Sequence, residues 1–231
     1  MNSVSQPTPR SNYLGNWMLG ALALAVTTIV IVVGLQTWRL RATIDEIRAL
    51  GGDVEWDSPA WIQAWTQEQP FPWCVTYRQV HLSYTVVDDS AFRRYMGVFD
   101  GFTDVERLGL SSTGLSESTL SELGTLPSLT QLDLDGTHTS DVALKQICAI
   151  TTLEELSITN TNVTDAGVVH LKRLPRLAVL SLDGTLVSDA SAENLAGIRT
   201  LEVISLSNTQ MTDEGVTVLQ SRFPLLDLTD D

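Results

Sequence analysis

Residues 153–176 read LEELSITNTNVTDAGVVHLKRLPR, and this stretch of 24 residues decides how the rest of the chain is interpreted. Its first part alternates apolar and polar residues, so Leu156 and Ile158 would share one side of a short strand. Thr164 suits the N-cap of a following helix, and Asp165 would then place a carboxylate in the first turn, where the helix dipole favours it. Apolar residues at helical spacing complete the stretch. It therefore predicts one strand and one helix, each with a single apolar side.

Four further stretches align with this one without gaps. The copies start 24 residues apart, at Val105, Leu129, Leu153, Leu177 and Leu201. A degenerate copy that is four residues longer begins at Tyr77, and the fragment FPLLDLTDD at residues 223–231 closes the chain. Because one copy cannot bury its own apolar side, we expect the copies to stack into a solenoid with a continuous core.

The shared pattern L-x-x-L-x-L-x-x-T-x-V-[ST]-D resembles the leucine-rich repeat over residues 77–228. That resemblance implies an α/β solenoid with parallel strands on the concave side and short helices on the convex side, here over residues 77–231. Threonine stands where the family usually has asparagine. Together with the Thr-Asp-Ala-Gly-Val run at 164–168, this resembles planctomycete-type bacterial proteins, many of which carry an N-terminal membrane anchor. The resemblance implies an anchored recognition module and no particular ligand.

Two polar columns recur from copy to copy, and we expect both to be structural. A threonine hydroxyl can replace the asparagine side chain that ties one loop to the next, although with a shorter reach. The threonine column comprises Thr85, Thr113, Thr137, Thr161, Thr185 and Thr209. The acidic column lies at the predicted helix starts and comprises Asp89, Glu117, Asp141, Asp165, Asp189 and Asp213.

The N-terminal part contains a candidate transmembrane helix. No charged residue occurs between Arg10 and Arg39, and residues 17–38 read WMLGALALAVTTIVIVVGLQTW. Such a helix would be roughly 33 Å long, enough to cross a hydrocarbon core. The alternative, a cleaved signal peptide, usually has a shorter apolar region and a small-residue cleavage site. We expect a single-pass anchor at 17–38 that follows a short tail at 1–16.

The side of the membrane is left open by the sequence. Arg39, Arg41 and Arg48 follow the anchor, so the positive-inside rule leans weakly toward a cytoplasmic repeat domain. Ala21 and Ala25 form a small-xxx-small pair that would allow two anchors to pack closely, which makes a homodimer one possibility.

Residues 39–76 are predicted to form a juxtamembrane helix and a Trp-rich N-terminal cap. The helix would continue from the anchor and end at Gly51-Gly52, with apolar residues at helical spacing: Leu40, Ile44, Ile47 and Leu50. Residues 54–56 alternate like a short strand, and Ser58-Pro59 suits the start of a further helix. Four of the six tryptophans lie between residues 56 and 73. A cover for the first repeat explains them, and a surface that docks on a membrane or a partner is the alternative.

The composition and the reactive residues point away from catalysis. A net charge of −14 argues against a nucleic-acid binder. The two cysteines have no zinc-site spacing, and the three histidines occupy different positions of the repeat, which excludes a predicted triad or metal site. Asp133 and Asp135 would together supply too few oxygens for an ordinary calcium loop. We expect no catalytic residue, no metal and no cofactor.

The most favoured function is a membrane-tethered, non-catalytic scaffold that binds a protein partner on the concave face. The candidate binding residues are Arg107, Gln131, Asp133, Asp135, Glu155, Ser157, Ser181, Asp183 and Ser205. Four of them are acidic and lie on adjacent predicted strands, which favours a basic partner. One alternative is a structural envelope protein that self-associates through the solenoid ends. The other is a small enzyme or effector that uses residues 39–76, a segment too short for an independent catalytic core.

Overall fold

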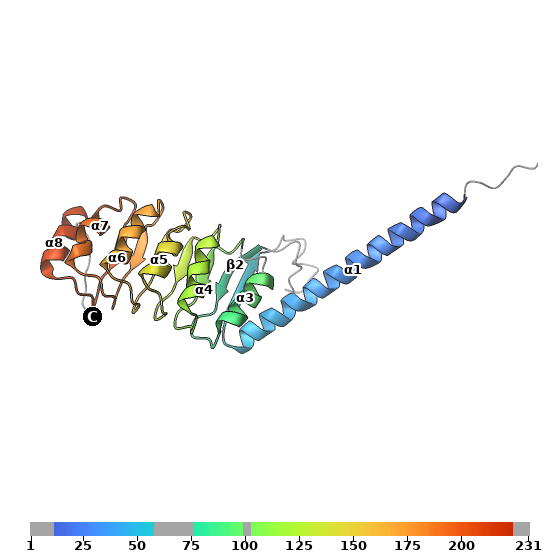
Figure 1. The fold of residues 1–231 in the computed structure, drawn as a ribbon, viewed down its shortest axis with the longest axis horizontal. Coiled ribbons are helices and arrows are strands. Elements are labelled where there is room, and N and C mark those ends of the chain that lie inside the picture. Colours follow the sequence, from blue (N-terminus) through green and yellow to red (C-terminus); the bar gives the residue numbers. More distant parts are fainter. Residues whose placement is uncertain (1–11, 58–75, 99–102, 224–231) are drawn as a thin grey trace, which may run out of the picture.

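Each repeat forms one short strand followed by one helical segment, and the repeats stack side by side (Figure 1). The computed structural model describes residues 12–57, 76–98 and 103–223, with side chains from residue 24 onward. Its strands form one seven-stranded sheet in chain order. The strands are β1 (Asp53–Asp57), β2 (Thr76–His81), β3 (Arg107–Gly109), β4 (Gln131–Asp133), β5 (Glu155–Ser157), β6 (Val179–Ser181) and β7 (Val203–Ser205).

The register of the sheet reproduces the sequence period. From β3 to β7 each residue pairs with the residue 24 positions later, as Leu132 does with Leu156. Between β2 and β3 the step is 28, as Gln79 with Arg107, which matches the longer first copy. Strands β2 to β7 are parallel, as predicted, whereas β1 pairs antiparallel with β2.

Short helical segments cover the other side of the sheet. They are α3 (Asp89–Val98), α4 (Glu117–Glu122), η2 (Leu123–Thr125), α5 (Asp141–Ile147), α6 (Asp165–Val168), η3 (Val169–Arg173), η4 (Asp189–Ser191), α7 (Ala192–Ala196) and α8 (Asp213–Arg222). The leucine, isoleucine and valine columns of sheet and helices meet between the two layers and are almost fully buried. Burial of these columns is the main force that holds the stack together.

The N-terminal helix α1 (Asn12–Ala49) is one continuous element of 38 residues. Its last turns cover the end of the core, where Leu40, Ile44 and Ile47 are buried. It stops in a Schellman motif: the N–H of Gly52 donates to the carbonyl of Ile47 at 2.9 Å, and Gly51 has φ +91°. The predicted helix and its glycine stop are confirmed, although Leu50 is exposed because the chain turns away there.

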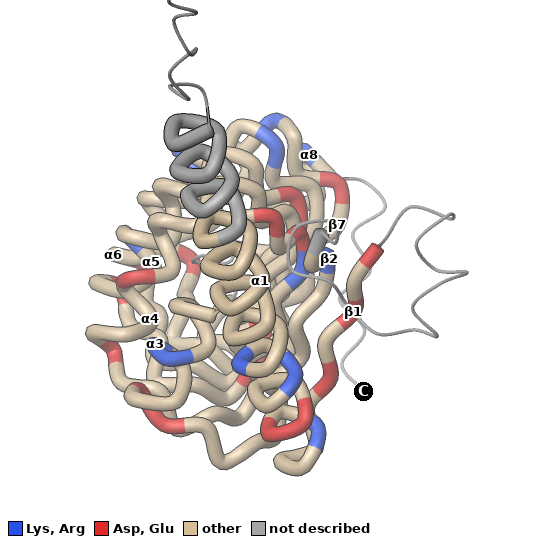
Figure 2. The backbone as a smooth tube through the Cα atoms, turned by 90° about the vertical axis from the view of Figure 1, so that its right-hand side faces the viewer, with Lys and Arg blue, Asp and Glu red and all other residues tan. Residues whose placement is uncertain are grey.

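Polar contacts support this cover. The carboxylate of Glu46 accepts hydrogen bonds from Arg94 and, at 3.1 Å, from the hydroxyl of Tyr95, which joins α1 to α3. The guanidinium of Arg48 lies 5.5 Å from the ring centre of Trp56 in β1. Figure 2, which looks at the N-terminal end, shows α1 crossing that end between β1 and the helical layer.

The predicted strand at 54–56 is confirmed as part of β1, in which Val54 is buried and the edge residues Asp53, Glu55 and Asp57 are exposed. Charged residues on an outer strand discourage pairing with another chain. The helix predicted to open at Ser58-Pro59 lies outside the described residues. The same holds for the closing fragment from residue 224 onward.

Candidate protein-interaction face

The exposed face of the sheet carries two rows of side chains, one residue per strand in each row. The first row comprises Gln79, Arg107, Gln131, Glu155, Val179 and Val203. The second row comprises His81, Gly109, Asp133, Ser157, Ser181 and Ser205. Alternation along each strand places the candidate strand residues in these rows and their apolar neighbours in the core. Asp135 and Asp183 follow their strands at one edge of this face.

A hollow of about 340 Å³ lies in the N-terminal half of this face. It is lined by Gln79, His81, Arg107, Leu108, Gly109, Gln131, Leu132, Asp133, Asp135, Glu155 and Ser157. Gly109 is its floor. A Cβ atom there would lie 2.8 Å from Nδ1 of His81 and 3.0 Å from Oγ of Ser83, so a side chain at this position requires these two side chains to shift. Gly109 thus contributes no side chain to the second row between His81 and Asp133.

Charges in the hollow are of both signs. Arg107 is exposed and forms no ion pair with another described residue, whereas its neighbour Arg78 lies 2.5 Å from Asp57 and 3.7 Å from Glu106. Across the hollow, Glu155 accepts a hydrogen bond from Gln131. A cation that lacks an internal partner is available to bind an external anion, and the carboxylates are available to bind an external cation.

The aspartates at the strand exits are engaged within the protein. Oδ1 of Asp135 accepts hydrogen bonds from Oγ of Ser157 at 2.6 Å and from the N–H of Thr159 at 2.8 Å. Asp183 repeats the arrangement with Ser205 and Ser207, at 2.6 and 2.7 Å. Burial raises the pKa of Asp135 despite these bonds. The other two predicted acidic residues also accept internal hydrogen bonds, Asp133 from the N–H of Asp135 at 3.1 Å and Glu155 from Gln131.

The C-terminal half of the face is different. Val179 and Val203 pair in the first row, and Ser181 pairs with Ser205 in the second. Val203 is 55% exposed. This half carries short uncharged side chains above the sheet, so the structure separates the candidate residues into a charged hollow and a flat uncharged strip.

The threonine column is buried except for the half-buried Thr209, but its hydroxyls bond within their own repeat. Oγ1 of Thr161 donates to the carbonyl of Ile158 at 2.7 Å, and Thr113 does the same with Leu110 at 2.7 Å. The residue before each threonine has a positive φ: Tyr84, Ser112, Gly136, Asn160, Gly184 and Asn208. Each threonine thus closes a left-handed turn after its strand. The Asn-Thr and Gly-Thr pairs of the sequence were the signal for this turn.

The acidic column makes the connection between repeats that was expected of the threonines. Asp165 accepts hydrogen bonds from the N–H and the hydroxyl of Ser188, at 2.8 and 2.6 Å, and from the hydroxyl of Ser191. Asp141 and Asp189 accept the equivalent bonds from Thr164 and Thr212. Each carboxylate therefore caps the N-cap residue of the following helix.

This connection also explains the glycine of the Thr-Asp-Ala-Gly run. A Cβ atom on Gly167 would collide with Oδ1 of Asp141, and one on Gly215 would collide with Oδ1 of Asp189. Where the following repeat has Ser191 instead, its hydroxyl donates to the carboxylate. The sequence showed the aspartate and the glycine but not that they meet across two repeats.

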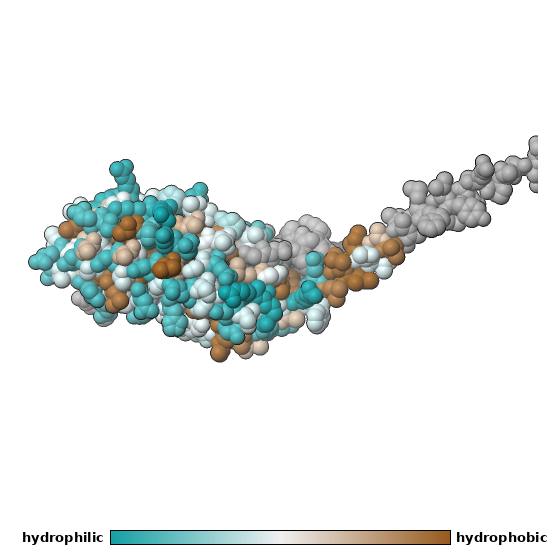
Figure 3. Space-filling view, in the orientation of Figure 1, coloured by the Kyte–Doolittle hydropathy of each residue, from teal (hydrophilic) through white to brown (hydrophobic). Residues whose placement is uncertain are grey.

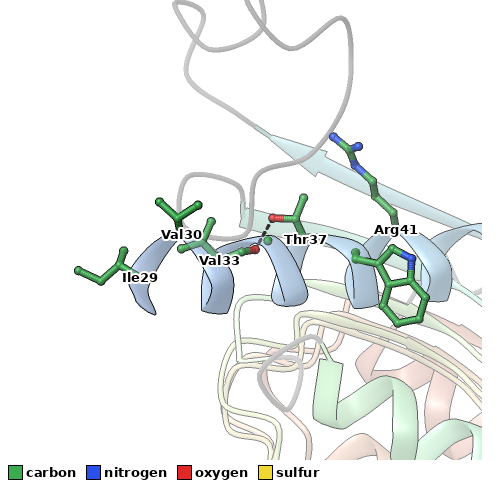
Figure 4. A pocket seen from close by; sticks show the side chains of 7 residues that line it. Ile29, Val30, Val33, Thr37 and Arg41 are labelled. Carbon is green, nitrogen blue, oxygen red and sulfur yellow. Dashed lines mark hydrogen bonds between the residues drawn. The ribbon is translucent and has the colours of Figure 1, made fainter. Parts of the chain in front are cut away.

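The exposed half of α1 is the second candidate feature. Leu24 is 73% exposed, Ile31 56% and Trp38 68%, and Figure 3 shows apolar residues gathered where α1 leaves the solenoid. The hydroxyls of Thr28 and Thr37 donate to carbonyls one turn earlier, at 2.8 and 2.7 Å. A groove of about 520 Å³ runs along this half (Figure 4) and is lined by Ile29, Val30, Val33, Gly34, Thr37, Trp38 and Arg41.

Within the described residues, one helix is long and apolar enough to cross a membrane. The same residues contain no group of three or more His, Cys, Asp or Glu that would hold a metal ion. Burial raises the pKa of Cys148 to about 12, so this thiol stays protonated at neutral pH and is a core residue.

Comparisons with known proteins agree with the fold. Residues 149–172 and 197–219 match the family described as leucine rich repeat, and no curated protein sequence matches the chain. The structure is similar to internalin C2 (inlC2) from Listeria monocytogenes str. 4b F2365, at 25% identity and a TM-score of 0.49, over 63% of this chain and 58% of that chain. It is also similar to an internalin (inlF) from the same strain, at 20% identity and a TM-score of 0.53, over 67% of this chain and 48% of that chain.

The chain thus spans about half the length of these two solved structures. The likeness to inlF concerns the fold, which the parallel sheet and the repeat match support independently. The architecture of this chain is a leucine-rich repeat solenoid.

Proposed function

We propose that this protein is a membrane-tethered scaffold that binds a protein partner in the hollow above Gly109 and performs no catalysis. The observation that carries the proposal is the combination of two surfaces on one chain. One is the apolar half of α1, and the other is the hollow with Arg107, which has no ion-pair partner among the described residues. Leucine-rich repeat solenoids typically use their concave face to bind partners.

The anchor is supported by the chemistry of α1 beyond residue 24. Large apolar side chains are exposed on it, and the printed threonine bonds leave those hydroxyls satisfied inside the helix. A lipid environment requires that polar groups be satisfied in this way. The anchor that we propose, residues 17–38, continues without a break into the buried turns around Leu40 and Ile47.

The first test removes only the anchor. A chain that starts at Arg39 retains the buried turns of α1, so we expect it to fold and to remain in the soluble fraction after lysis. The full chain should float with membranes and resist extraction by high salt. Sedimentation of the shortened chain with membranes would place the anchoring surface elsewhere.

The partner should present a basic group. Asp133 and Glu155 lie on the side of the hollow opposite the exposed Arg107, so a lysine or arginine of the partner would find two carboxylates there. The same partner should also present a hydrogen-bond acceptor to the guanidinium of Arg107. These requirements confine the acidic patch expected from the sequence to the hollow, because Asp133, Asp135 and Glu155 line it and Asp183 does not.

The second test locates the contact. A photo-crosslinking amino acid at Gln131, in the hollow, should give a discrete adduct in intact membranes. The same amino acid at Gln146, exposed on α5, is the matched control and should give none. The adduct should disappear when Gly109→Gln fills the hollow. An adduct that persists in that variant would move the contact off the hollow.

The structure offers less to the two alternatives. For the small enzyme or effector at residues 39–76, residues 40–57 pack on the core of the first repeat, and residues 58–75 lie outside the described part of the chain. The same cover occupies the N-terminal end of the solenoid. That end is therefore not available for end-to-end stacking with another copy.

A further inference from the structure

The charges of the C-terminal repeats are separated between two edges of the solenoid. Between Leu129 and Phe223, every lysine and arginine lies in a last helical turn or in the loop that leads to the next strand. We name these six residues the basic edge: Lys145, Lys172, Arg173, Arg176, Arg199 and Arg222. All six are exposed, and none forms an ion pair with another described residue.

The opposite edge carries only negative charge. From the strand ends to the first helical turns of the same repeats there is no lysine or arginine. We name the carboxylates of the first helical turns the acidic edge: Asp141, Asp165, Asp189, Asp213 and Glu214. The first three are half-buried and accept hydrogen bonds from the next repeat, and Asp213 and Glu214 are exposed. The segments α5 and α8 carry acids in the first turn and a base in the last turn, as the helix dipole favours. Because all helices run in the same direction, their acidic ends lie along one edge of the solenoid and their basic ends lie along the other.

The basic edge is not purely basic. Glu154 and Glu202 directly precede β5 and β7, Glu155 begins β5, and Glu193 lies in α7. The six cations nevertheless outnumber these four carboxylates, in a chain whose net charge is −14. A group of unpaired cations on such a chain calls for an anionic surface, and the acidic edge of the same protein is one.

Anchoring would bring the two kinds of edge together. Helix α1 leaves from one end of the solenoid, so the solenoid extends away from its anchor (Figure 1). Two copies in one membrane then stand beside each other with their long sides facing. Confinement to a membrane raises their effective concentration, so a weak contact is enough.

We propose that the basic edge binds the acidic edge of a second copy of this chain in the same membrane. The proposal rests on the anchoring part of the proposed function and leaves the hollow free for a partner. The contact is heterologous, since the two surfaces differ, so each copy retains one unused edge and rows can grow. It also acts over a short range, because the screening length is about 8 Å at physiological salt.

The test is a charge swap in liposomes. Full-length chains carry a donor or an acceptor fluorophore on a C-terminal fusion, and energy transfer reports proximity. One variant is Arg176→Glu with Arg199→Glu, and the other is Asp213→Lys with Glu214→Lys. Each variant alone should lose most of the transfer seen with the unmodified chain, and transfer by the unmodified chain should fall as salt rises.

The decisive arm mixes the two variants. Their altered edges are again complementary, and the mixture has the same total charge as the unmodified chain, so transfer should return. Circular dichroism checks that each variant is folded. Full transfer in either variant alone would assign proximity to another surface, such as the anchor itself. Absence of rescue between two folded variants would overturn the pairing of the edges.

Flotation of the same liposomes separates this inference from the proposed function. Chains that float without energy transfer would refute the edge contact and leave the anchored scaffold intact. Chains that do not float would refute both.

Discussion

The cover at the N-terminal end and the repeats from Leu129 onward enclose one core by different means. In the cover, Leu40, Ile44 and Ile47 fill the open end of the first repeat, and Glu46 ties α1 to α3. The repeats add a hydrogen-bonded link at regular intervals, as from Asp165 to Ser188. The difference teaches that a repeat is recognised from its residue types in the sequence, whereas the residues that cover the core are established by their contacts in the structure.

The largest effect is expected at the cover. Ile47→Ala removes a fully buried side chain (0% exposed) and should lower the free energy of unfolding by about 2–5 kcal/mol. Chemical denaturation of the full chain in detergent micelles measures it. Ile31→Ala, in the exposed half of the same helix, is the matched control and should change stability by less than about 0.5 kcal/mol. Similar losses in both variants would remove the distinction between the two halves of α1.

The second-largest loss of stability is expected when the hydrogen-bonded link between repeats is removed. Asp165→Ala leaves two donors of Ser188 and the buried hydroxyl of Ser191 without their acceptor, which should cost about 1–3 kcal/mol. The exposed Glu193→Ala is the control. If the aspartate variant is as stable as the control, the repeats are held by apolar burial alone.

A smaller loss of stability is expected when a hydrogen bond within one repeat is removed. Thr161→Val removes the hydroxyl that donates to the carbonyl of Ile158 and should cost about 1–2 kcal/mol. Thr161→Ser retains the hydroxyl and should recover most of the loss. Because the two bonds share no partner, the effects of Thr161→Val and Asp165→Ala should be additive in the double variant. Strong coupling would show that turn and link form one network.

The smallest effect concerns pH. Bonds from Ser116 lower the pKa of Asp89, and bonds from Thr212 lower that of Asp189. For Asp165, burial would raise the pKa, but bonds from Ser188 and Ser191 outweigh it and the pKa is lowered. These groups stabilise the fold while ionised. Their contribution is complete above the unfolded value of about 4 and is lost as the pH falls through the lowered values.

Asp135 acts in the opposite sense. Its raised pKa means that its charge costs stability at neutral pH and that protonation relieves this cost as the pH falls. Thermal melts between pH 7 and pH 3 should therefore show a net decline at the acid end. The decline should be shallower in Asp165→Ala, and an equal decline in both proteins would contradict the assignment.

Much of the architecture was predictable because the period is a local property. Apolar residues recurring every 24 positions indicate which side of each strand and helix is buried, and the observed register follows that period. The continuation of α1 to Gly51 was equally visible, since helical spacing and a glycine stop lie close together in the chain. The candidate face was predicted at the level of strands for the same reason.

The threonine column and the acidic column show what the sequence period could not predict. Both columns were expected to be structural, but the inter-repeat role was assigned to the threonines. In the threonine column the hydroxyl donates to the carbonyl three residues earlier, as Thr161 does to Ile158, whereas the carboxylates of the acidic column reach the next helix. Which of two columns bridges two repeats depends on distances across the stack.

Sequence alone therefore determined the repeat, its two layers and the apolar character of residues 17–38, because periodicity and composition are carried by neighbouring residues. Only the tertiary structure decided that Ile47 is buried while Ile31 is exposed, since both belong to one apolar helix. It also decided that Gly109 lines a hollow together with His81 and Asp133, two residues that lie 52 positions apart in the chain. Such features depend on which side chains the stacking brings into contact, and no local pattern records that.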